Sequence, residues 1–242
     1  MSSMNDVYWL EQTSTDVPPE DKWLSEAEAA RLERLRFAKR RNDWRLGRWT
    51  AKVAVSRCFG LPTHAPQLTR IEIAANGSGA PEALVSGFPQ SVPISLSHRA
   101  GRAICAVAPG SAEIGCDLEL IEPRSDAFVD EFFSALEIDA ISQVGGRERA
   151  VVANALWSAK ESTLKALRIG LAANTREIEV DLGYLVATSR VGGAWRPLQV
   201  RKAGGRRFRG WWETSDDFVR TVVTYPATGE PVSLLGLSQA SF

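Results

Sequence analysis

The sequence has few of the residues that build thiolate or imidazole sites. Its 242 residues include three cysteines and two histidines. The cysteines, Cys58, Cys105 and Cys116, stand far apart in apolar sequence and form no C-x-x-C pair. This spacing argues against a disulfide framework and against a thiolate zinc site. A histidine-rich metal centre is excluded as well, whereas carboxylate ligands for a hard cation are available.

Long apolar runs are also missing. No segment approaches the roughly 20 apolar residues that a membrane-spanning helix needs, and residues 1–23 lack the basic start and apolar core of a secretory signal. We therefore expect a cytoplasmic protein with no membrane partner. With 44% hydrophobic and 24% charged residues, the composition is that of an ordinary folded protein. The length fits one large domain or two small ones.

The net charge is zero, but the charges are segregated. Between Arg31 and Arg57 there are ten basic and two acidic residues, whereas between Glu113 and Asp139 there are nine acidic residues and one base, Arg124. A basic wall and an acidic pocket on one molecule suit a metal-bound polyanion. Two solvated faces of opposite sign would produce the same pattern.

Helix and strand signals alternate twice along the chain. Ser25 and Glu28 form a capping box that predicts the start of a helix, and a second helix is predicted over residues 42–58, before Gly60 and Pro62. The other predicted elements are strands at 71–75, 94–98, 103–108 and 114–120, helices at 125–144 and 151–167, and strands at 177–182 and 218–225. This order predicts an α+β protein, a two-layer α/β arrangement, with two similar halves at residues 1–111 and 112–242. No repeat of individual residues is visible.

The segment EIGCDLEL predicts a strand with two carboxylates on one face. Because side chains alternate along a strand, Asp117 and Glu119 point the same way, beside the small Gly115. Two close carboxylates repel, so one must be protonated or a cation must lie between them. Mg²⁺ is bound by such oxygen ligands. An exposed polar strand face is the alternative interpretation.

The segment ALWSAKESTLKAL predicts a helix in which Trp157, Glu161, Lys165 and Arg168 share one face. Glu161 and Lys165 are spaced for a surface ion pair. Alternatively, Glu161 is a third carboxylate beside Asp117, and Lys165 neutralises a phosphate. The spacing alone does not decide between these two hypotheses.

A row of like charges follows one face of the predicted helix 42–58. It consists of Arg41, Arg45, Arg48 and Lys52, with no acidic residue placed on the row to neutralise it. Such a row is unfavourable unless solvent or an anion screens it. Phosphate is the natural anion for arginine side chains.

The segment SLSHRAGR predicts a phosphate-binding strand end, with Ser97, His98, Arg99 and Arg102. A hydrolase in which His98 activates Ser97 is disfavoured, because adjacent strand residues point to opposite faces. A structural histidine is the alternative. The pair Trp211-Trp212 amid arginines resembles a nucleic-acid platform, but a strand with one core face is the commoner explanation. We therefore expect no nucleic-acid partner.

Several motifs occur together and in order: SLSHRAGRAICAVAP, GCDLE, FFSALE and WSAKESTLKAL. In sequence and spacing they closely resemble the Sfp-type 4′-phosphopantetheinyl transferases, over about residues 94–171 and more weakly back to residue 36. The family implies two pseudo-twofold-related halves with coenzyme A bound between them. It also implies a 4′-phosphopantetheinyl transferase of the holo-carrier-protein synthase type.

The resemblance implies roles for particular residues. Asp117, Glu119 and Glu161 correspond to the Mg²⁺ ligands, with Mn²⁺ as the other metal, and Lys165 to the contact with the coenzyme A pyrophosphate. The expected contacts to the 3′-phosphate are Ser97, His98, Arg48 and Lys52. Glu137 occupies the position of a family acid after FFS. One departure is Gly79-Ala80-Pro81, where the family often has a lysine in the middle.

The implied reaction moves phosphopantetheine from coenzyme A to a serine of an apo carrier protein, acyl, peptidyl or aryl, and releases adenosine 3′,5′-bisphosphate. The expected catalytic residues are Glu161, Lys165 and Asp117, with Glu161 or a metal-bound water accepting the serine proton. A two-half chain is expected to be a monomer. The alternative is an inactive module that binds coenzyme A or a carrier protein without transfer.

Overall fold

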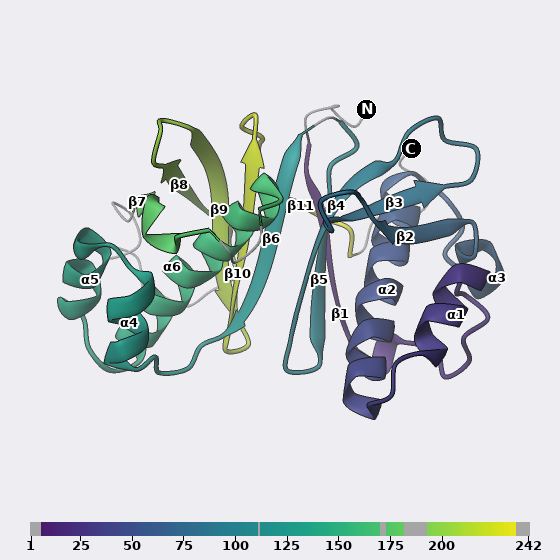
Figure 1. Ribbon diagram of the computed structural model, residues 1–242, viewed down its shortest axis with the longest axis horizontal. Helices are drawn as coiled ribbons and strands as arrows, with labels where there is room; N and C mark the ends of the chain where they lie inside the picture. Colours follow the sequence, from purple (N-terminus) through teal and green to yellow (C-terminus); the bar gives the residue numbers. More distant parts are fainter. Residues whose placement is uncertain (1–5, 111, 170–172, 182–192, 236–242) are drawn as a thin grey trace. The chain divides into compact units, whose positions relative to one another are not determined.

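The computed structural model describes residues 6–110, 112–169, 173–181 and 193–235. The chain divides into two compact units (Figure 1). The first comprises Met1–Ala112 with Pro231–Phe242, and the second comprises Glu113–Glu230. The first unit thus also takes the C-terminal segment, which the sequence-based division assigned to the second half. No helix among the described residues is long and apolar enough to cross a membrane.

The first unit is a six-stranded sheet with the long helix α2 packed on it (Figure 1). Its strand order is β11-β1-β5-β4-β3-β2, antiparallel except for the β1–β11 pair. Its elements are β1 (Tyr8–Thr13), η1 (Ser14–Asp16), α1 (Glu26–Glu33), α2 (Ala38–Cys58), α3 (Ala65–Leu68), β2 (Ile71–Ala75), β3 (Pro81–Val85), β4 (Val92–Arg99), β5 (Arg102–Val107) and β11 (Val232–Ser233). Helix α2 begins four residues earlier than predicted.

The second unit is a five-stranded antiparallel sheet with the order β6-β10-β9-β8-β7. Its elements are β6 (Glu113–Leu120), α4 (Asp126–Phe132), α5 (Ala135–Ser142), α6 (Gly146–Leu167), η3 (Thr175–Glu177), β7 (Ile178–Asp181), β8 (Arg196–Lys202), β9 (Arg207–Ser215) and β10 (Phe218–Tyr225). Helix α6 packs mainly on β6 and β10. In β9, Trp212 is buried and Trp211 half-buried, as expected for a strand with one core face.

The helix predicted over residues 125–144 is two helices, α4 and α5. The chain is extended at Phe133, and Ser134 then caps a new helix. The Ser134 hydroxyl accepts from the amide of Glu137, and the Glu137 carboxylate accepts from the amide of Ser134. This capping box starts α5 and so interrupts the apolar periodicity that suggested one continuous helix.

The two units have the same topology, which confirms the expected α+β class. Strands β1-β5-β4-β3-β2 correspond in order to β6-β10-β9-β8-β7, and α2 corresponds to α6. At equivalent places in these helices stand Trp49-Thr50-Ala51-Lys52 and Trp157-Ser158-Ala159-Lys160. The chain therefore does contain a short residue-level repeat, which the sequence analysis missed.

A buried lysine–glutamate pair is repeated with it. In the first unit, Lys52 pairs with Glu28, and Nζ donates to the carbonyls of Trp23 and Leu68. The second Glu28 oxygen accepts from the amide of Ile73, on β2. Burial of two charges is tolerable only when their hydrogen bonds are satisfied in this way.

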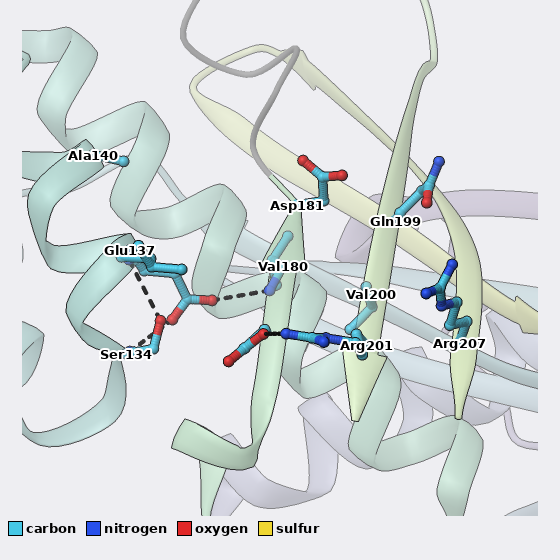
Figure 2. Close-up of a pocket in the computed structure, with 11 residues that line it drawn as sticks. Ser134, Glu137, Ala140, Val180, Asp181, Gln199, Val200, Arg201 and Arg207 are labelled. Carbon is cyan, nitrogen blue, oxygen red and sulfur yellow. Dashed lines mark hydrogen bonds and ion pairs between the residues drawn. The ribbon is translucent and has the colours of Figure 1, made fainter. Parts of the chain in front are cut away.

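In the second unit, Lys160 Nζ lies 2.8 Å from Glu137 Oε2 and donates to the carbonyls of Thr175 and Ile178. Glu137 Oε1 accepts from the amide of Val180, on β7 (Figure 2). Strands β2 and β7 are the last in their sheets. Each glutamate therefore accepts a hydrogen bond from an edge-strand amide that has no acceptor on a neighbouring strand.

Candidate active site

Gly115 allows α6 to approach β6 closely. A Cβ atom at this position would lie 1.7 Å from the carbonyl oxygen of Ser162, which no real side chain could tolerate. Glycine is therefore required because of the helix backbone and not because of a turn. The close approach brings Asp117 on β6 to Lys165 on α6, and Glu119 to Trp157.

Lys165 is paired with Asp117. Its Nζ donates to Asp117 Oδ1 at 2.8 Å and to the Cys116 carbonyl at 3.0 Å. Burial is the largest single influence and would lower the pKa of Lys165, but the charges of Asp117, Cys116 and Glu161 and the hydrogen bond to Asp117 together outweigh it, and the pKa is raised. Of the two sequence-based hypotheses, the surface ion pair between Lys165 and Glu161 is not what the structure shows. Lys165 is an ammonium held inside the carboxylate cluster.

Glu119 is held from two sides. Its Oε1 accepts from the indole Nε1 of Trp157 at 3.1 Å, and its Oε2 accepts from Nη2 of Arg124 at 3.0 Å. The sequence analysis placed Trp157 on the right helix face but gave Arg124 no role. The available signal was that Arg124 is the one base in the acidic segment.

The pKa of Glu161 is raised from its ordinary value of 4.5 to about 7. Burial is the largest cause, the charges of Asp117 and Glu119 act in the same direction, and Lys165 opposes them in part. The mutual effect shows that the three predicted carboxylates lie near enough to interact. Without a bound cation, Glu161 is therefore partly protonated at neutral pH.

The donor set suits a hard dication in type and charge. It consists of the carboxylates of Asp117, Glu119 and Glu161, and a cation between them would relieve the repulsion that raises the pKa of Glu161. Among the described residues, no three His, Cys, Asp or Glu side chains are already grouped to hold a metal. Lys165 and Arg124 bind two of the carboxylates instead.

Ser97 and His98 lie near the end of β4, in the first unit. Ser97 is half-buried and His98 is exposed. In the β4–β5 pairing, His98 lies opposite Ala103, and the turn that follows uses the left-handed backbone of Ala100 and Gly101. The exposed imidazole thus lies next to a tight hairpin turn.

The row of cations on α2 has a different role from the expected one. Arg45 pairs with Asp21 at 2.7 Å and donates to the carbonyl of Pro18, and Arg41 donates to the carbonyl of Leu32. These side chains fasten α2 to the preceding chain. Their partners come from another part of the sequence, so the helical pattern did not reveal them.

The last two members of the row differ from each other. Lys52 is completely buried in its pair with Glu28, so its ammonium offers no surface to a phosphate group. Arg48 lies over the ring of Trp44 at 4.9 Å, and burial lowers its pKa. Its Nε has no hydrogen-bond partner among the described residues. This Nε is itself buried, although Arg48 as a whole is only half-buried.

A cavity of about 510 Å³ lies elsewhere in the second unit, between α5 and strands β7 to β9 (Figure 2). Its wall includes Glu137, Gln199, Arg207 and the ion pair of Glu179 with Arg201. None of Asp117, Glu119, Glu161 or Lys165 lines it. The carboxylate cluster is thus a separate site.

The chain resembles known proteins over the segment that contains this cluster. Residues 113–206 match the 4′-phosphopantetheinyl transferase superfamily. The chain is 40% identical to a holo-[acyl-carrier-protein] synthase of Streptococcus sanguinis over 86 residues, which are 36% of this chain and 71% of the relative. It is 27% identical over 176 residues to the 4′-phosphopantetheinyl transferase HetI of Nostoc sp., covering 72% of this chain and 71% of the relative.

A solved structure, Helicobacter pylori holo-[acyl-carrier-protein] synthase in complex with coenzyme A, aligns with 42% of this chain and 97% of its own. The TM-score of this alignment is 0.33, and the two sequences are 19% identical. The sequence matches are sufficient: the chain belongs to the 4′-phosphopantetheinyl transferase superfamily. It is an enzyme of this class, and the sequence-based assignment is confirmed.

Proposed function

We propose that this protein transfers 4′-phosphopantetheine from coenzyme A to a serine of an apo acyl or peptidyl carrier protein and releases adenosine 3′,5′-bisphosphate, in a reaction that requires Mg²⁺. The observation that carries the proposal is Glu161. It stands among two further carboxylates and the Lys165 ammonium, with its pKa raised to about 7. Cytoplasmic location and a monomeric state stay predictions of the sequence.

Asp117, Glu119 and Glu161 would hold the cation. When bound, Mg²⁺ supplies positive charge to the diphosphate of coenzyme A and so makes its phosphorus more electrophilic. Lys165 contributes a fixed positive charge of its own, because Asp117 holds the ammonium in place. This charge stabilises the negative charge that grows on the leaving phosphate oxygen.

The carrier serine provides the nucleophile. Its oxygen attacks the phosphorus that bears pantetheine, the bond from that phosphorus to the bridging oxygen breaks, and the bridging oxygen leaves with adenosine 3′,5′-bisphosphate. The serine proton passes to a carboxylate oxygen of Glu161. The pKa of about 7 is that of the metal-free cluster, and a bound cation lowers it, so Glu161 meets the serine as an ionised carboxylate.

The adenosine end of coenzyme A would be bound by residues of the first unit. We assign the 3′-phosphate to His98 with Ser97 and to Arg48. His98 is exposed at the end of β4, and Arg48 is a cation whose Nε has no hydrogen-bond partner within the described chain. Both groups are suited to a phosphate dianion.

The test is intact-mass spectrometry of an apo carrier protein incubated with this protein, coenzyme A and Mg²⁺. We expect a gain of one phosphopantetheine mass, which EDTA suppresses and which the variant E161Q does not produce. The variant K39Q is the control, because Lys39 is an exposed lysine paired only with Asp43 among its described contacts. No gain on several unrelated carriers would overturn the proposal.

A further inference from the structure

Arg124 stands between β6 and α4, directly beside the carboxylate cluster. Its Nη2 donates to Glu119 Oε2 at 3.0 Å, its Nε donates to Asn154 Oδ1 at 2.8 Å, and its guanidinium lies over the ring of Phe128 at 4.8 Å. The side chains of Arg124 and Glu119 are 15% and 14% exposed. The pair is thus well shielded from solvent.

The orientation of Arg124 is determined by the residues around it. Asn154 is completely buried, and its Nδ2 donates to the carbonyls of Glu122 and Ala150 at 2.7 Å each. This leaves Oδ1 facing Arg124 and directs the guanidinium towards Glu119. Trp157 holds the other Glu119 oxygen. The contact between Arg124 and Glu119 is therefore fixed by neighbouring side chains, unlike a pair of mobile surface charges.

We propose that Arg124 is the internal counter-ion of Glu119 and sets the affinity of the carboxylate cluster for its divalent cation. This inference rests on the proposed function, in which Glu119 is a cation ligand. A cation that binds Glu119 must displace the guanidinium or share the carboxylate with it. The divalent cation then loses part of its attraction to Glu119 and is repelled by the positive charge of Arg124.

Arg124 and Lys165 occupy comparable positions, each on one carboxylate of β6. They differ in what the reaction needs from them. Lys165 has a role towards the diphosphate, so its charge is required when the cation is bound. Arg124 is directed at Glu119 and Asn154, so its charge acts against the cation. Arg124 is therefore a positioning residue that holds the Glu119 carboxylate in place, at the expense of cation affinity.

The test measures Mn²⁺ binding without coenzyme A, from the electron paramagnetic resonance signal of the free ion. The variants are R124Q, which removes the charge, and R124K, which keeps it. The matched control is R149Q, because Arg149 donates to Asp126 and to the Arg124 carbonyl. We expect R124Q to bind Mn²⁺ about tenfold more tightly than the natural chain, the effect of one charge-assisted hydrogen bond.

R124K and R149Q should bind Mn²⁺ with an affinity within about twofold of that of the natural chain, because both variants keep a positive charge at position 124. If R124Q folds poorly, N154A serves instead, since it removes the acceptor that orients Arg124; it should bind Mn²⁺ more tightly than the natural chain. Equal or weaker binding by R124Q, or by N154A in its place, overturns the inference alone. Absence of Mn²⁺ binding in every variant overturns both the inference and the metal site of the proposed function.

Discussion

Lys52 in α2 and Lys160 in α6 occupy equivalent positions, and each forms a buried ion pair with a glutamate in the first turn of a helix. Each of these glutamates also accepts a hydrogen bond from the backbone amide of an edge strand. Burial lowers the pKa of both lysines, and the paired carboxylates oppose this shift. The position after Lys160 is Glu161, whereas the position after Lys52 is Val53. The same pair thus occurs without the reactive carboxylate, which assigns it to the fold and not to the chemistry.

Removing either lysine should destabilise the protein to a similar extent. In K52M and in K160M, a buried glutamate loses its partner, and we expect a loss of about 3–5 kcal/mol in the free energy of unfolding. Urea unfolding followed by circular dichroism measures it. K22M is the control, because Lys22 is exposed in a surface pair with Glu20. A loss below about 1 kcal/mol for either variant, the scale of a surface pair, would contradict the assignment.

The variant G115A should disrupt the site through the backbone. The added methyl would collide with the Ser162 carbonyl, so α6 must move away from β6 and carry Glu161 and Lys165 with it. We expect a loss of several kcal/mol in stability and of most transferase activity. G47A is the control: nothing lies within 4 Å of its new methyl, and alanine should stabilise α2 by up to about 1 kcal/mol.

The stability of the metal-free protein should fall as the pH rises through the range in which Glu161 ionises. The folded-state pKa of Glu161, about 7, lies above its ordinary value of 4.5. The folded state therefore binds the proton more tightly, and the contribution is full below about pH 4.5 and is lost as the pH rises through 7. Urea unfolding at several pH values in EDTA measures the slope. E161Q should lack this component, and an identical slope in E161Q would refute it.

Lys165 should be needed for the chemical step. Substitution by methionine removes the charge that faces the leaving phosphate, and we expect kcat to fall about 100-fold or more, as for loss of one transition-state donor. The measurement is the initial rate of carrier modification at saturating coenzyme A. K202M, in the second unit at the end of β8, is the control. A K165M enzyme with unchanged kcat and a higher KM would assign Lys165 to binding only.

His98 should recognise the 3′-phosphate. The variant H98A should raise KM for coenzyme A about tenfold, the effect of one charge-assisted hydrogen bond, and should leave KM for 3′-dephospho-coenzyme A unchanged. His64, the other histidine of the chain, is also exposed, so H64A is the matched control and should affect neither substrate. Equal effects of H98A on both substrates would show that His98 acts through the fold.

Local patterns were reliable where a local rule determines the structure. The alternation of EIGCDLEL correctly predicted that the Asp117 and Glu119 side chains share a face of β6, and both contact α6 in the structure. The boundaries were less reliable, since the break at Phe133 was hidden by apolar periodicity. The capping box at Ser134 was readable in the sequence and was overlooked.

The row of cations on α2 shows where such patterns fail. A helix position specifies which side chains share a face, but not what they meet there. Arg45 meets Asp21 and Lys52 meets Glu28, both from residues before the helix. What looked like one phosphate-binding surface is largely the attachment of α2 to its own unit. Arg48 is the member that keeps an unsatisfied donor among the described residues.

The family can be recognised from the order of the motifs, and strand alternation is enough to put Asp117 and Glu119 on one face, because both are properties of the chain itself. Which cation meets which carboxylate depends on the packing of distant elements: Lys165 meets Asp117, and Arg124 meets Glu119. Such packing also places Lys52 in the core. The physical reason is that a long charged side chain can reach several partners, and packing between distant elements selects one of them.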